Sequence, residues 1–200
     1  MGGFFINKLA ESPWEFFSWV IVVAFSICVH ELFHAWVALK CGDDTAARAG
    51  HLTLNPLVQM GVQSLIMLAL LGIAWGMVPV NPAALRPMQR AKVAFAGPAA
   101  NLALSAAFAL VAVLTWRFTA PGGEPSPAIS LVLMASRANA VLFILNMLPV
   151  PSFDGWSVLG GFFPALEDWT ARFGPQAGWI ALAILFLTPA SALVWMGGEA

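Results

Sequence analysis

Apolar residues occur along the chain in five long runs that are separated by short polar segments. The runs cover approximately residues 14–39, 62–80, 93–118, 128–150 and 178–195. A helix needs about 20 apolar residues to cross a bilayer core about 30 Å thick, and several runs reach that length. The pattern predicts an all-α polytopic membrane protein with about four to five transmembrane helices, whose main spans are approximately 14–40, 93–118, 128–150 and 176–196.

The polar segments contain no internal repeat and no second soluble domain, so we expect residues 1–200 to form one membrane-embedded domain. One of these segments has the sequence GHLTLNP, in which residues 51–54 alternate between polar and apolar side chains before an Asn-Pro stop. That alternation predicts a short β-strand or β-hairpin.

Composition favours an integral membrane protein over a soluble one. Hydrophobic residues make up 60% of the chain and charged residues only 10%, whereas soluble domains average about 25% charged residues. Most of the nine tryptophans lie near the ends of the apolar runs, where interfacial aromatic residues gather. The net charge of −1 argues against a nucleic-acid partner, and we expect a lipid bilayer around the chain.

The first apolar run contains the sequence His30-Glu31-Leu32-Phe33-His34. Two histidines four residues apart lie on one face of a helix, so both imidazoles can bind one metal ion. Zinc suits such a pair, and a catalytic zinc site adds a third protein ligand and an open position for water. Glu31 can then act as general base. A chance match is disfavoured, because ionisable side chains inside apolar spans are rare.

The sequence NMLPVPSFDGW, residues 146–156, offers the third ligand. Pro149 and Pro151 cannot continue a helix, so the backbone after the fourth run has to open out. Asp154, followed by Gly155, is then presented from an irregular segment. An ordinary helix exit with an Asp-Gly turn is the alternative, and the pairing with the histidine motif favours the metal ligand.

These motifs, taken in order, resemble those of the site-2 protease family of intramembrane zinc metalloproteases. The resemblance is to the small bacterial and archaeal form without PDZ or CBS modules, and it covers the chain through residue 155. The matching stretches are HELFHAWVALKCGDDTA, GHLTLNPL, PVNPAALR, FAGPAAN and NMLPVPSFDG. Five motifs in one order make the resemblance specific.

The resemblance implies roles for five residues. His30, His34 and Asp154 would bind Zn²⁺, and Glu31 would be the catalytic base. Asn146 would be a second catalytic residue that orients the substrate or stabilises the oxyanion.

The chain departs from the family pattern at four positions. Phe33 stands where Gly is frequent and would crowd the approach to the metal, and Phe153 stands where Leu is common. His51 replaces a common Arg, and Gln59 falls where the small forms often have His. None of these changes removes a catalytic group, so we expect activity with an altered substrate cleft.

Several polar residues keep more than one interpretation. His51 is a fourth zinc contact, a pH-sensitive gate or, most ordinarily, a solvated strand side chain. Arg137 either faces a polar interior with Asn101 and Asn139 or marks a shorter fourth span, because a cation at membrane depth is costly. The same two asparagines, with Asn146, are candidates to line a water path to the metal.

The positions of the ligands constrain the topology. The two histidines lie in the later half of their span and Asp154 just past the end of its own, so the two spans run in parallel. Parallel spans need an odd number of crossings between them, yet two apolar runs intervene. The run at 62–80 is short and rich in glycine, and we expect it to be re-entrant or to lie along the membrane rather than to form an additional span.

The cations agree with this topology. One side of the membrane then carries most of them, and the positive-inside rule makes that side cytoplasmic. The cytoplasmic set is Lys40, Arg48, Arg86, Arg90, Lys92 and Arg172, against Lys8 and Arg117 on the other side. The zinc site would open towards the cytoplasmic side of a prokaryotic cell (inner) membrane.

The expected function is hydrolysis of a peptide bond in or near a transmembrane segment of a membrane-protein substrate, as in regulated intramembrane proteolysis. The strand-like residues 51–54 would pair with the unwound substrate by β-addition. The alternative is a metal-binding membrane protein without protease activity, such as a transporter or a degenerate regulator. A transporter would carry further acidic or histidine residues through its spans, so the enzyme is favoured. The oligomeric state stays open.

Overall fold

Three long helices form the frame of the protein, seen in a computed structural model that describes residues 5–119 and 125–166. They are α2 (Pro13–Lys40), α6 (Pro87–Thr119) and α7 (Pro127–Asn146). Each is long and apolar enough to cross a membrane. They coincide with the first three predicted spans, and the span expected at 176–196 lies outside the described residues.

The long helices begin where the sequence allows them to begin. Each has a proline as its first residue, at positions 13, 87 and 127, where the fixed φ suits the helix and the missing N–H removes no intrahelical bond. Ser126 also caps α7, because its side chain accepts a hydrogen bond from the backbone N–H of Ile129.

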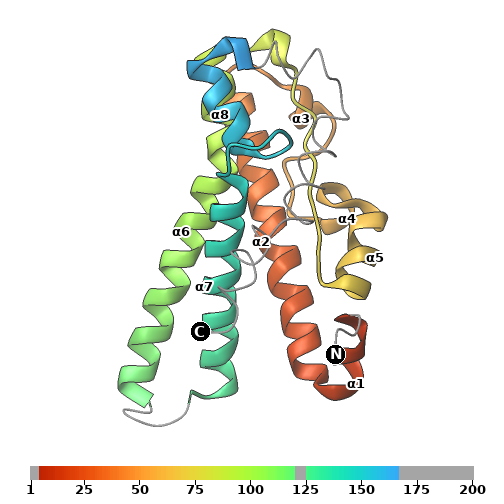
Figure 1. Cartoon of the computed structure of the whole chain (residues 1–200), viewed down its shortest axis with the longest axis vertical. Coiled ribbons are helices and arrows are strands. Elements are labelled where there is room, and N and C mark those ends of the chain that lie inside the picture. The colour runs from red at the N-terminus through yellow and green to blue at the C-terminus, as the bar shows by residue number, and fades with distance from the viewer. Residues whose placement is uncertain (1–4, 120–124, 167–200) are drawn as a thin grey trace.

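The three helices alternate in direction. Figure 1 shows α2 and α7 running the same way and α6, which lies beside α7, running the opposite way. The spans that carry the histidine pair and the Asp-Gly motif are therefore parallel, as the positions of the ligands require. Small residues line the contact between α2 and α7, where Ala135 and Ala138 pack with Val22.

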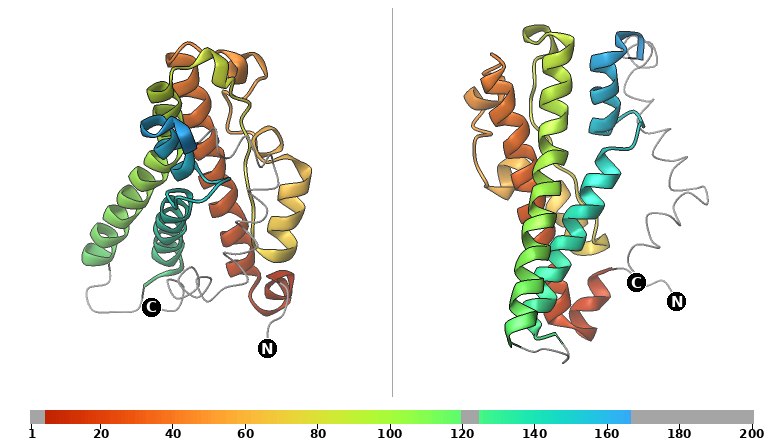
Figure 2. Two further views of the ribbon diagram at one scale, coloured as in Figure 1. Left: turned by 45° about the horizontal axis from the view of Figure 1, so that its top comes forward. Right: turned by 90° about the vertical axis from the view of Figure 1, so that its left-hand side faces the viewer.

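Short elements surround this frame. On the N-terminal side lie a 3₁₀ turn (Phe5–Asn7) and α1 (Lys8–Glu11). Between α2 and α6 lie α3 (Thr45–Arg48), α4 (Pro56–Gln59), α5 (Gly61–Leu71) and a 3₁₀ turn (Pro82–Ala84). After α7 the chain forms α8 (Asp154–Phe162), which lies beside the first turns of α6 in the right-hand view of Figure 2.

The run at 62–80 forms a helix that descends and an extended segment that returns (Figure 1). The helix, α5, has 11 residues and ends at Gly72, whose left-handed φ of 75° is the usual glycine C-cap. Residues 73–81, called the connector below, then run back along the bundle in extended form. Trp19 holds the turn, because its indole N–H donates to the Gly72 carbonyl (2.9 Å).

The strand or hairpin expected at residues 51–54 is not confirmed. Within the described residues no β-strand is present, and this stretch is irregular. The buried amide of Gln59 explains the difference, because its Nε2 donates to the carbonyls of His51 (2.8 Å) and Thr53 (2.7 Å). A side chain thus occupies the acceptors that a neighbouring strand would have used.

Candidate metal centre

The structure brings together three of the residues singled out from the sequence. His30 and His34 lie one turn apart on the buried face of α2, and their Nε2 atoms are 2.9 Å apart. Asp154 Oδ2 lies 3.0 Å from His30 Nε2 and 3.3 Å from His34 Nε2. These three atoms form a compact group that could hold a metal ion.

The orientation of His34 leaves its Nε2 free to be a ligand. Its Nδ1 lies 2.7 Å from the backbone oxygen of Val93 on α6. A carbonyl only accepts hydrogen bonds, so the proton is on Nδ1 and the lone pair is on Nε2.

The orientation of His30 is fixed by a chain of buried side chains across all three long helices. Asn139 on α7 donates through Nδ2 to the carbonyl of Ala135 and to Ser26 Oγ (both 2.8 Å), which fixes its amide orientation. Its Oδ1 then accepts from Asn101 Nδ2 (2.8 Å), so Asn101 Oδ1 accepts from His30 Nδ1 (2.5 Å). The lone pair of His30 is therefore also on Nε2.

This chain of hydrogen bonds corrects the expected water path. Asn101 and Asn139 are fully buried, and both amides are occupied by protein partners. They orient a histidine instead of lining a channel. Their buried polar side chains within apolar runs were the sequence signal for a site, but their partners depend on how α6 and α7 pack.

The size and chemistry of the cluster fit a zinc ion. Tetrahedral ligands at about 2.1 Å from Zn²⁺ lie about 3.4 Å from one another, close to the separations found here. Gly97 on α6 provides the space, because a Cβ at this position would overlap the Nε2 atoms of both His30 and His34. Two neutral imidazoles and one carboxylate are a usual ligand set for catalytic zinc.

Asp154 reaches the histidines from the start of a short helix. We expected an irregular segment, and residues 147–153 are irregular, but Asp154 itself is the first residue of α8. The next residue has to be glycine, because a Cβ on Gly155 would overlap the carbonyl groups of Met147 and Leu148. α8 packs closely on α6, where Gly161 lies against Ala91.

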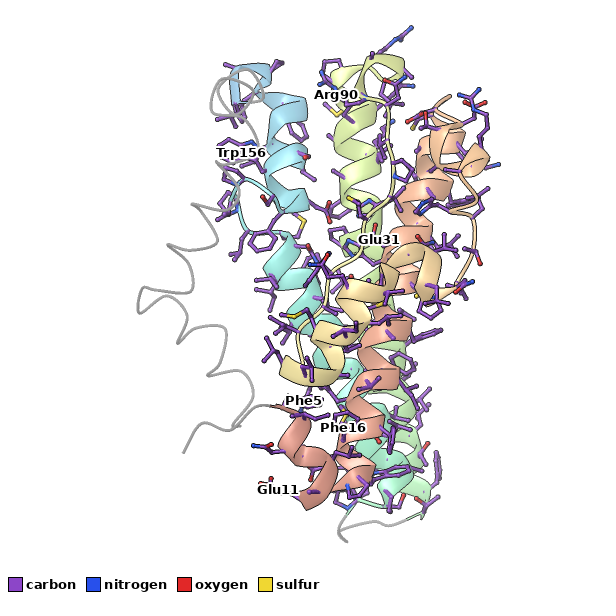
Figure 3. The ribbon with its side chains drawn as sticks, turned by 90° about the vertical axis from the view of Figure 1, so that its right-hand side faces the viewer. Phe5, Glu11, Phe16, Glu31, Arg90 and Trp156 are labelled. Carbon is purple, nitrogen blue, oxygen red and sulfur yellow. The ribbon has the colours of Figure 1, made fainter. Side chains whose placement is uncertain are left out.

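Glu31 follows His30 on α2 and lies under the connector (Figure 3). The residue is 7% exposed. A Cβ on Gly76 would overlap the Glu31 carboxylate, so glycine lets the connector pass directly over this side chain. The connector therefore forms one wall of the space around Glu31.

Two side chains and one backbone carbonyl hold the connector by its backbone. Ser64 Oγ on α5 accepts from the Trp75 N–H (2.9 Å) and donates to the Trp75 carbonyl (2.6 Å). The Gln59 carbonyl accepts from the Met77 N–H (3.0 Å). Asp43, just after α2, accepts from the Asn81 N–H (2.7 Å).

Asp43 is an anchor that the sequence analysis missed. The residue is 2% exposed, and its carboxylate also accepts from the backbone N–H (3.0 Å) and hydroxyl (2.5 Å) of Thr45. Burial alone would raise the pKa of Asp43, but the hydrogen bonds from Thr45 and Asn81 hold this pKa below its usual value. The carboxylate is therefore charged at neutral pH.

The other residues discussed from the sequence lie around the cluster. Asn146 is the last residue of α7 and donates from Nδ2 to the Leu142 carbonyl (2.9 Å). His51 is partly buried, and its Nδ1 pairs with Gln59 Oε1 (3.1 Å), so it is not the solvated strand side chain we expected. Among the described residues the group that could hold a metal contains only three members, and His51 is not one.

One further expectation, for Phe33, is corrected, and one of the two alternatives for Arg137 is excluded. Phe33 does not face the ligands: it lies outside the buried face of α2, and its ring packs edge-on against Trp36. Arg137 does not face the interior with Asn101 and Asn139, since it is exposed while both asparagines are buried.

Comparisons with known proteins give a consistent result. Residues 18–121 match the family model described as Peptidase family M50. The chain is 33% identical over 183 residues to "Putative zinc metalloprotease YwhC" of Bacillus subtilis, covering 88% of this chain and 82% of the relative. It is 32% identical over 186 residues to "Putative zinc metalloprotease Rip2" of Mycolicibacterium smegmatis, covering 86% and 68%. No solved structure gives a significant match.

Proposed function

The chain belongs to peptidase family M50, a family of zinc metalloproteases, and on that premise we propose that it is an intramembrane endopeptidase. Its substrates are membrane proteins, and it hydrolyses peptide bonds in or near their transmembrane segments. One observation carries the proposal: His30, His34 and Asp154 converge beside Glu31 among helices apolar enough to cross a membrane.

In this proposal His30, His34 and Asp154 hold the zinc ion through two imidazole nitrogens and one carboxylate oxygen. Bound zinc lowers the pKa of a water molecule and polarises the scissile carbonyl. The hydrogen bonds from the two imidazoles to Asn101 and to the Val93 carbonyl keep both Nε2 lone pairs directed at one point.

Glu31 is the proton carrier. Its carboxylate accepts a proton from the attacking water and then delivers that proton to the leaving amine nitrogen. General acid–base catalysis of this kind contributes about 10²- to 10⁴-fold in rate. The connector over Glu31 supports this role, because a side chain enclosed on that side is kept from bulk water.

The connector is the proposed docking strand for the substrate. In an extended chain the N–H and C=O groups of alternate residues point to opposite edges. The hydrogen bonds made by the backbone N–H groups of Trp75, Met77 and Asn81 occupy one edge of the connector. The backbone N–H and C=O groups of Ala74 and Gly76 therefore point to the other edge. An unwound substrate segment can add to that edge by β-addition, which assigns to the connector the role we expected of residues 51–54.

Asn146 retains its proposed part in orienting the substrate or stabilising the oxyanion. It precedes the turn that leads to Asp154, which supports a position near the cleft. Replacing Asn146 with Asp, which keeps the shape but removes the amide donor, should lower kcat more than it raises KM. An unchanged kcat would remove Asn146 from the mechanism.

We further propose that residues 1–200 form one membrane domain in which α5 and the connector are re-entrant, with the zinc site opening to the cytoplasm of a prokaryotic cell. Cys41 follows the end of α2 and is partly exposed, whereas Cys28 is buried within α2. A membrane-impermeant thiol reagent should modify Cys41 in inverted vesicles and not from outside intact cells. A Cys28→Ser form serves as the control, and modification from outside would reverse the orientation.

The decisive experiment uses Glu31→Gln, which keeps the shape of the side chain and removes the base. This form should retain its zinc and lose cleavage by about 10²- to 10⁴-fold. Membrane proteins captured by the inactive form are then offered to the wild type, which should cleave them. Glu15→Gln, at the exposed start of the same helix, is the matched control.

Two results of this experiment have opposite meanings. Cleavage of captured proteins by the wild type and not by Glu31→Gln supports the protease. Zinc binding without cleavage of any captured protein would instead identify a metal-binding membrane protein without protease activity.

A further inference from the structure

An arginine occupies the outer face of the helix that leads to the third ligand. Arg137 is exposed, as are Val141 and Ile144, which follow it at positions i+4 and i+7 of α7. Residues at this spacing share one helix face. This part of the outer face of α7 therefore carries two apolar side chains and one permanent positive charge.

This charge lies at the middle of the membrane-crossing frame. The preceding residue, Ser136, donates to the Ser105 carbonyl in the middle third of α6 (2.9 Å). The following residue, Ala138, packs with Val22 in the middle third of α2. At 1.5 Å per residue, about 15 Å of α7 lies on either side of Arg137, so the guanidinium starts far from both interfaces.

The packing of α7 keeps Arg137 on the outside. Asn139 is fully buried and donates to Ser26 across the helix interface (2.8 Å). Ala135 and Ala138 are buried in the same contact. Rotating α7 to bring the arginine inwards would break this chain of bonds, and with it the support of His30.

In the part of the chain that the structure describes, Arg137 has no counter-charge at this depth. Among the described residues the guanidinium has no hydrogen-bond or ion-pair partner. Within the three long helices the only acidic residues are Glu31 and Glu15, and Glu15 pairs with Lys8 at the start of α2. The remaining apolar run, 178–195, contains no Asp or Glu.

We propose that the face of α7 formed by Arg137, Val141 and Ile144 binds the transmembrane helix of another protein that carries an Asp or Glu near its middle. A cation at this depth is costly unless it is paired, and the carboxylate of such a helix meets it at the same level. A symmetric second copy of this chain is disfavoured, because a two-fold contact through this face would bring two arginines together. Lipid phosphates lie at the interfaces, beyond the central position of this side chain.

The test measures peptide binding in phosphatidylcholine vesicles, using the full-length Glu31→Gln form so that no peptide is cleaved. The probes are dansyl-labelled Leu/Ala transmembrane peptides that carry Glu, Gln or Leu at the central position. Energy transfer from the nine tryptophans to dansyl reports binding. The Glu peptide should bind about tenfold tighter than the Gln peptide, since a buried interhelical polar contact reaches about this size.

Charge variants assign the effect to one residue. Arg137→Leu should bind the Glu peptide no better than the Gln peptide, and Arg137→Glu should prefer a central-Lys peptide. Arg117→Leu, at the exposed end of α6, is the matched control and should keep the preference for Glu. Zinc content and circular dichroism verify that each variant is folded.

Two outcomes would overturn the proposal. Equal affinity for the Glu and Gln peptides would show that the face does not recognise a carboxylate. A preference for Glu that persists in Arg137→Leu would show that another part of the protein binds it. Both outcomes are independent of cleavage, so they leave the protease assignment to its own experiment.

Discussion

Two regions border Glu31, and different kinds of bond hold them in place. On one side, a chain of buried side-chain hydrogen bonds between α2, α6 and α7 orients His30, and the Val93 carbonyl on α6 orients His34. On the other side the connector is fixed at its backbone by single side chains from Asp43 and Ser64 and by the Gln59 carbonyl. Asn101 in the first region is fully buried, whereas Met77 in the second is 77% exposed.

The difference indicates that the two regions have different functions. A closed network of buried side chains permits one geometry, which suits a metal that needs fixed ligand positions. Attachment by the backbone along one edge leaves the other edge and the outward side chains free, which suits an extended substrate. Substitutions in the first region should therefore lower the zinc content, whereas substitutions in the second should slow cleavage and leave the zinc content unchanged.

The strongest test of the first region is Gly97→Val. The added side chain would occupy the space at the Nε2 atoms of His30 and His34, so zinc content and cleavage should both fall to background. Metal analysis of the purified protein measures this directly. Ala103→Val, on an exposed face of the same helix, should keep its zinc. A variant at Gly97 with full zinc content would contradict the proposed position of the ion.

A smaller effect is expected from Asn101→Leu. It leaves the shape of the helix interface nearly unchanged and removes the acceptor for the His30 Nδ1–H. Loss of such a supporting bond costs about 10- to 100-fold in metal affinity, which competition with a chelator can measure. The exposed Leu102→Ala is the control. Unchanged affinity would mean that the network does not orient His30.

For the second region, Asp43→Ala removes the acceptor that the Asn81 N–H and Thr45 use. We expect about tenfold slower cleavage, a raised KM and unchanged zinc content, because the connector loses one of its attachments. Asp44→Ala is the matched control, since Asp44 is exposed and pairs only with Arg48 at the surface, where ion pairs contribute little. Loss of zinc from Asp43→Ala would contradict the proposal that the connector affects cleavage and not zinc binding.

The smallest effect should come from Phe33→Ala. The residue lies away from the ligands and contacts Trp36, so zinc content should not change and cleavage should stay within about twofold of the wild type, as for most exposed substitutions. Cleavage that rises strongly would mean that Phe33 does restrict the approach to the metal.

Local sequence determined much of the candidate site. The 3.6-residue period of one α-helix brings His30, Glu31 and His34 close together, so their proximity can be predicted without the rest of the fold. The parallel arrangement of α2 and α7 followed from the positions of the candidate ligands along their two apolar runs. Pro149 and Pro151 predicted the break after α7, although α8 at Asp154 was not expected.

The tertiary structure decided which groups surround that site. The sequence alone could not assign Asn101 and Asn139 to His30 because the bonds join three helices whose rotation depends on packing. The strand expected at 51–54 is not confirmed, because the Gln59 side chain donates to two carbonyls of this stretch, a contact that the sequence pattern does not indicate. Likewise the need for glycine at positions 76 and 97 depends on the side chains that lie opposite them, because a missing Cβ matters only where another part of the chain comes close.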